Sequence, residues 1–179
     1  MADDTTIFDI ADWLLECSRA AIAQTSAGAP GRRYVSVGRP AHDNCCAGGG
    51  QLTVAKIRNY PSDEFPTAST QSTPCGGRYL VVQFEIEVVR CAPVPANDGT
   101  PPSAELLHAS AREAEVDARA VYKGVRCCMA ERVRHWQDGG WAAGFEGYID
   151  NQVPITPEGG CNGSRTTVVV GVPDGCDCA

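Results

Sequence analysis

The stretch RYLVVQFEIEVVR, residues 78–90, decides the fold class. Its side chains alternate between apolar and polar, which is typical of a β-strand with two different faces. One face would carry Leu80, Val82, Phe84, Ile86 and Val88. The other face would carry Gln83, Glu85 and Glu87. We interpret Glu85 and Glu87 as part of a solvated strand face, or one that meets another chain, rather than as paired catalytic carboxylates.

Two helices flank this strand in the sequence. Residues 6–24 have apolar side chains three and four positions apart, and Thr6 with Asp9 resembles a capping box. Residues 103–134 repeat the same spacing over a longer stretch, with Ser103 as the N-cap and Gly124 as a candidate kink. The sequence therefore predicts an N-terminal helix and one long second helix.

The remaining segments predict shorter strands and long loops. Strands are expected at 34–37, 51–60 and 166–172, with an irregular one at 141–149. Loops are expected at 38–50, 61–77 and 154–164, followed by an irregular tail at 173–179. The predicted fold is one α+β domain, residues 1–179, with a mixed, mainly antiparallel sheet and the element order α-β-β-β-α-β-β.

The net charge of −7 argues against anionic binding partners for this protein. An acidic surface repels nucleic-acid phosphates and anionic lipids, so neither duplex binding nor membrane docking is expected. Residues 1–6 are polar and acidic, with no basic segment ahead of an apolar one. We therefore expect synthesis in the cytoplasm and no export by a standard route.

Ten cysteines are unusual for such a protein. The possible disulfide residues are Cys45, Cys46, Cys75, Cys161 and Cys176. Cys45 or Cys46 could pair with Cys75, and Cys161 could pair with the Cys176-x-Cys178 tail, but free thiols are also possible. A virion component, made in the cytosol and later exposed to an oxidising exterior, would account for disulfides.

Zinc binding by His42, Cys45, Cys46 and Cys75 is an alternative. The spacing lacks a C-x-x-C pair and adjacent cysteines place two sulfurs poorly on one ion, so no metal and no cofactor is expected. Cys128 falls on the apolar stripe of the long helix, where we expect a small hydrophobic residue.

Catalytic motifs are missing from the sequence. It contains no G-x-S-x-G, P-loop, H-E-x-x-H or dinucleotide-binding pattern, and His42, His108 and His135 are the only histidines that could serve a thiol enzyme. We expect a protein that is not an enzyme.

The pattern of elements resembles the tail terminator proteins of long-tailed bacteriophages. The features that carry the resemblance are the 6–24 helix, the FEIEVVR strand with Cys91 and Pro93 in the turn after it, and the helix from Ser103. The resemblance implies a virion protein at the head-proximal end of the tail, made in the host cytoplasm. It also implies a homohexameric ring that contacts the tail tube protein and a head-completion or neck protein, while genomic DNA passes without specific binding.

Two other functions remain open from the sequence. One is another head-tail connector or minor tail protein. The other is a cysteine-rich metal-binding module.

Overall fold

The computed structural model describes residues 6–69, 78–137 and 145–173. For residues 132–137 and Glu158 it describes the backbone alone. Its helices are α1 (Thr6–Ile22) and α2 (Ala104–Gln137), with a short 3-10 turn at Ala47–Gly49. Its strands are β1 (Arg32–Val37), β2 (Gln51–Ser62), β3 (Tyr79–Cys91), β4 (Glu146–Glu158) and β5 (Cys161–Pro173). The predicted α+β class and element order are confirmed.

The five strands form one mixed sheet in the order β1-β2-β3-β5-β4. β1 runs parallel to β2, and every other neighbouring pair is antiparallel. β3 corresponds to the strand predicted at residues 78–90. It lies at the centre of the sheet, where β2 and β5 pair with it along nearly its whole length. The alternation of its side chains therefore sets which residues of the neighbouring strands face the same side.

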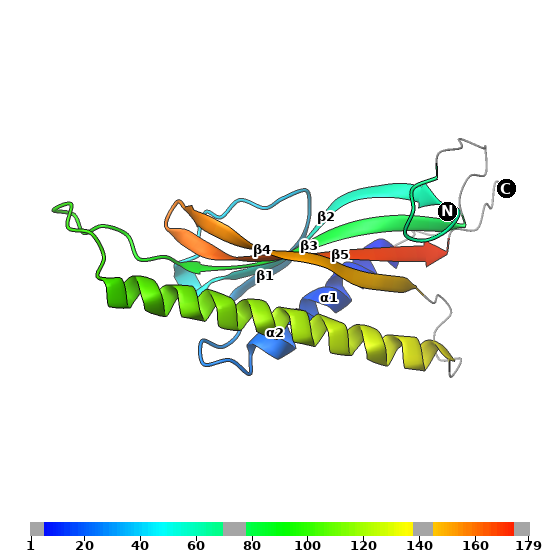
Figure 1. The fold of residues 1–179 in the computed structure, drawn as a ribbon, viewed down its shortest axis with the longest axis horizontal. Coiled ribbons are helices and arrows are strands. Elements are labelled where there is room, and N and C mark those ends of the chain that lie inside the picture. The colour runs from blue at the N-terminus through cyan, green and yellow to red at the C-terminus, as the bar shows by residue number, and fades with distance from the viewer. Residues whose placement is uncertain (1–5, 70–77, 138–144, 174–179) are drawn as a thin grey trace.

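Both helices pack on one side of the sheet (Figure 1). The core between the layers joins one apolar face of the sheet to the apolar stripes of α1 and α2. Its fully buried members include Leu14, Ile22, Leu52, Val54, Phe84, Val125, Val168 and Val170. Segment 38–46 lies over the opposite side of the sheet, and we call it the strap (Figure 1).

Gly124 marks the crossing of the two helices. A kink was a possibility here, but α2 is one continuous helix from Ala104 to Gln137. A Cβ at residue 124 would lie 2.5 Å from the Cβ of Ala21 and 3.2 Å from the carbonyl oxygen of Cys17. Glycine therefore serves close helix packing at this position.

Arg90, at the end of β3, is a buried cation on the helix side of the sheet. Its Nε lies 2.6 Å from Oδ2 of Asp117 in α2, and both side chains are buried. The same guanidinium donates hydrogen bonds to the carbonyl oxygens of Gly28 and Gly49. Arg90 thus connects α2, the loop after α1 and the 3-10 turn to the central strand.

The prediction for residues 154–164 was wrong. A loop was predicted, but β4, which contains Pro154 and Pro157, extends to Glu158, and β5 begins at Cys161. Only Gly159 and Gly160, both with positive φ, form the turn of this hairpin. The proline residues are accommodated because β4 is an edge strand, where one side of the backbone needs no partner in the sheet.

Three other predicted segments lie partly or wholly outside the residues that the structure describes. Residues 70–77 of the expected 61–77 loop, residues 141–144 of the expected 141–149 strand, and the tail from 174 onward lie outside the described residues. Within the described part, neither helix carries an apolar stretch that could cross a bilayer.

The helix crossing gives a first prediction. Replacing Gly124 by Leu should destabilise the protein by about 1–3 kcal/mol, because overpacking against α1 outweighs the gain of about 1 kcal/mol in helix propensity. The same type of side chain at exposed Ala109 in α2 should change stability by less than about 0.5 kcal/mol. Urea unfolding followed by circular dichroism measures both. Equal stabilities for the two variants would contradict the close crossing.

Candidate functional site

The candidate site begins with two buried carboxylates on the side of the sheet that faces away from the helices. The side chains of Glu85 and Glu87 are only 4% and 1% exposed. A carboxylate removed from water without a partner is strongly destabilising, so such groups need cations or hydrogen-bond donors nearby. The interpretation of these residues as a solvated strand face is therefore wrong.

The first cation comes from the neighbouring strand β5. Arg165 is the direct cross-strand partner of Glu87. Its Nε lies 2.6 Å from Oε1 of Glu87 and 3.2 Å from Oε2 of Glu85. One guanidinium group therefore bridges both carboxylates.

The second set of partners comes from the strap. Arg39 donates two hydrogen bonds to Glu85, from Nε to Oε2 at 2.8 Å and from Nη2 to Oε1 at 3.0 Å. This paired contact with Glu85 raises the pKa of the Arg39 guanidinium above its ordinary value. Nε2 of His42 lies 2.8 Å from Oε2 of Glu87. Each carboxylate is thus held between a residue of β5 and a residue of the strap.

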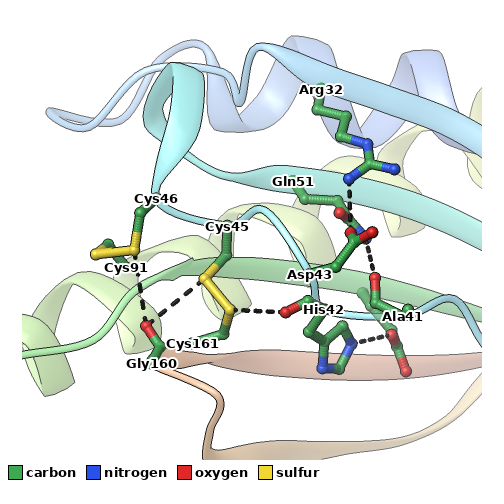
Figure 2. Close-up of a disulfide and its surroundings, with 11 residues drawn as sticks. Arg32, Ala41, His42, Asp43, Cys45, Cys46, Gln51, Cys91, Gly160 and Cys161 are labelled. Carbon is green, nitrogen blue, oxygen red and sulfur yellow. Dashed lines mark hydrogen bonds and ion pairs between the residues drawn. A yellow bond between two sulfur atoms is a disulfide. The ribbon is translucent and has the colours of Figure 1, made fainter. Parts of the chain in front are cut away.

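Two disulfides fasten the end of the strap to the sheet (Figure 2). Cys45 pairs with Cys161 of β5, and Cys46 pairs with Cys91 of β3. Cys91 and Cys161 are themselves cross-strand partners, so two adjacent strap residues join two adjacent strands. The sulfurs of Cys45 and Cys46 also lie 3.6 and 3.9 Å from the carbonyl oxygen of Gly160 in the β4–β5 turn.

The cysteine expectations are thereby partly corrected. Cys45, Cys46 and Cys161 form disulfides, but Cys91, which was not among the candidates, takes the place considered for Cys75. Cys161 pairs with the strap rather than with Cys176. Cys75, Cys176 and Cys178 lie outside the described residues. Because Cys45 and Cys46 are engaged in disulfides, they are not available with His42 as zinc ligands.

A third disulfide joins the two helices. Cys17 of α1 pairs with Cys128 of α2, close to the crossing at Gly124. The expectation that Cys128 acts only as a small hydrophobic residue is wrong. Within the described part of the chain, Cys127 is a free and exposed cysteine.

Hydrogen bonds and an exposed ion pair hold the middle of the strap. Gln51 of β2 donates from Nε2 to the Ala41 carbonyl at 3.3 Å and to the Tyr34 hydroxyl at 3.1 Å. Arg32 of β1 lies 2.7 Å from Asp43, and this contact lowers the pKa of the Asp43 carboxyl below its ordinary value. The strap is therefore attached to four of the five strands: to β1 through Arg32, to β2 through Gln51, to β3 through Glu85 and Glu87, and to β5 through Cys161.

Two buried polar atoms close to the strap lack hydrogen-bond partners within the described structure. They are Oε1 of Gln51 and Oγ1 of Thr53, which lie two residues apart on β2. Thr53 is the cross-strand partner of Glu87, so this polar strip continues the charged network onto β2. The arrangement is typical of a polar layer between a sheet and a covering loop.

An open hollow of about 430 Å³ adjoins the strap. Its lining consists of Arg39, Pro40, Ala41, His42, Asp43, Gly159 and Arg165. The arginine residues in this lining are already paired with Glu85 and Glu87, and the lining contains no serine, threonine or cysteine nucleophile. No group of three or more metal-ligating side chains with a suitable arrangement occurs among residues 6–69, 78–137 and 145–173.

Comparison with known proteins gives no further assignment. The chain matches no protein-family model, and no curated protein matches it significantly. The function must therefore be inferred from the fold and from the strap site.

The ion network gives a second prediction. Glu87→Gln should destabilise the protein by about 1.5–3 kcal/mol, because it removes a buried charge-assisted contact with Arg165, which keeps only its contact with Glu85. The matched change Glu115→Gln removes only an exposed pair with Arg119, so about 0–1 kcal/mol is expected. Urea unfolding of both variants tests this. A Glu87→Gln effect as small as that of Glu115→Gln would show that the network is dispensable.

The strap disulfides give a third prediction. Removing the Cys46–Cys91 bridge with the double change Cys46→Ser/Cys91→Ser should cost about 4 kcal/mol, because the unfolded chain regains the freedom of a 45-residue loop. Cys127→Ser, which removes an exposed free thiol, should leave stability nearly unchanged. Unfolding under non-reducing conditions measures both. Equal midpoints in the double variant and the unmodified protein would refute the bridge.

Proposed function

We propose that this chain is a structural virion protein, the tail terminator of a long-tailed bacteriophage. In this role it forms a homohexameric ring that caps the tail tube and joins it to the neck. The observation that carries the proposal is a sheet with both helices on one side and two edge strands, β1 and β4, that pair with only one neighbour each. Such a unit can add copies of itself at both edges.

The chemistry of the strap site supports an assembly role over catalysis. Its charges neutralise each other inside the fold, and its cysteines form disulfides. These contacts fix a surface in one shape, as an interface requires. Arg39 and Arg165 line the adjoining hollow, but both are paired there with Glu85 and Glu87.

The net charge also supports the proposal. A ring that surrounds DNA during its passage benefits from like-charge repulsion, and the chain carries a net charge of −7. Disulfides fit a particle that leaves the reducing cytoplasm of its host. The proposed partners are the tail tube protein on one side of the ring and a head-completion or neck protein on the other.

Imaging of assembled tails tests the proposal. We expect this chain as a single ring at the head-proximal end of the tube, located by antibody labelling or by fitting the fold into a reconstruction. Addition of purified tube protein to the purified chain should yield capped tubes of the same appearance. Finding the chain along the whole tube, at the distal tip or absent from particles would reject the assignment.

A further inference from the structure

The two edge strands of the sheet present exposed apolar side chains. Val37 at the end of β1 is 73% exposed, and Tyr148 and Val153 of β4 are 38% and 41% exposed. Open sheet edges tend to pair with other strands, so proteins protect them or use them for assembly. Apolar side chains at both edges favour use in assembly.

The two edges carry opposite charges. β1, residues 32–37, contains Arg32 and Arg33 and no acidic residue, and both arginines are exposed. Residues 146–153 of β4 contain Glu146 and Asp150 and no basic residue, and both acids are exposed. Asp150 falls at the bulge between Ile149 and Asn151, outside the β4–β5 pairing. Complementary charge at two separate surfaces of one molecule favours contact between unlike surfaces of two copies.

Charge also decides the symmetry of that contact. A two-fold pair of β1 with β1 would be antiparallel and would join two basic edges, with Arg32 opposite Val37 at full overlap, and a pair of β4 with β4 would join two acidic edges. Neither arrangement sets an arginine opposite an acid. Only the head-to-tail contact, in which β4 of one copy meets β1 of the next, brings opposite charges together. This type of contact generates a ring when the rotation from one copy to the next closes.

The strand directions suit the same contact. β2 and β5 both run opposite to β3, β1 runs with β2, and β4 runs opposite to β5. β1 and β4 therefore run in opposite directions, and the sheet of one copy would continue into the next through an antiparallel pair. Pro154 and Pro157 lack amide hydrogens, which restricts pairing to residues 146–153 of β4. The six residues of β1 fit within that length.

We propose that the interface between subunits is the acidic half of the β4 edge, residues 146–153, set against the basic β1 edge, residues 32–37, of a second copy of this chain. The inference rests on the proposed ring and names the surfaces that form it. The apolar side chains of Val37, Tyr148 and Val153 would become covered at the junction.

Charge reversal at each edge tests this interface in solution. One variant is Arg32→Glu/Arg33→Glu, and the other is Glu146→Lys/Asp150→Lys. Each alone should weaken self-association about tenfold or more, because every junction then opposes like charges. The exposed Arg32–Asp43 pair contributes little to stability, so its loss should leave the first variant folded, which thermal unfolding checks.

An equimolar mixture of the two variants provides the decisive measurement. In a ring where the variants alternate, every junction regains opposite charges, so the mixture should associate again in sedimentation velocity at low ionic strength. The control Arg112→Glu/Arg126→Glu changes the net charge by the same amount as Arg32→Glu/Arg33→Glu, but at exposed positions of α2. It should associate like the unmodified chain. A mixture that stays monomeric, or a single variant that associates normally, would overturn the interface.

The outcome separates this inference from the proposed function. Reassociation of the mixture together with tails that lack the ring would uphold the interface and reject the tail terminator role. A ring on tails together with a monomeric mixture would uphold that role and reject these surfaces.

Discussion

Two carboxylates on the central strand impose the main constraint on this structure. Glu85 and Glu87 alternate with the core residues of β3, so packing the helices on one side forces both acids to the other. No helix of the described chain covers that side (Figure 1), yet both side chains are buried. Because uncompensated burial of a carboxylate is so unfavourable, a segment that supplies cations or hydrogen-bond donors must lie across this face. The strap, with Arg39 and His42, meets that requirement, and Arg165 completes it from within the sheet.

The buried guanidinium of Arg90 imposes a similar requirement on the helix side of the sheet. Arg90 is only two positions from Val88 in the core pattern, and its guanidinium is satisfied by Asp117 and by backbone carbonyls of two loops. β3 therefore carries unlike charges on its two sides, and each selects which segment packs there. Buried, fully paired charges specify one packing arrangement between the sheet and each covering segment, which apolar contacts alone would specify poorly. The long helix and the strap are thus positioned by electrostatics as well as by the core.

The sequence predicted what depends on local periodicity and missed what depends on distant pairing. Alternation in residues 78–90 and the three-four spacing around Leu14 and Val121 gave the central strand and the helices correctly. The burial of Glu87 was not predictable locally, since its partners lie 45 and 78 residues away in the chain. The cystine partners are separated by 45 to 116 residues, and many pairings of ten cysteines fit the sequence equally. The β4–β5 hairpin was obscured because its proline and glycine residues resemble loop signals, while the pairing with β5 overrides them.

The disulfides reinforce an arrangement that other contacts already specify. Cys91 and Cys161 are adjacent because β3 and β5 pair in register, and that register is fixed by the valine residues of the core and by the Glu87–Arg165 pair. His42 and Arg39 bring the strap over the same strands, which places Cys45 and Cys46 beside them. Under reducing conditions the thiols would therefore already lie close together in the folded chain, and oxidation would lock that conformation. The charged network can thus position the strap before any bridge forms.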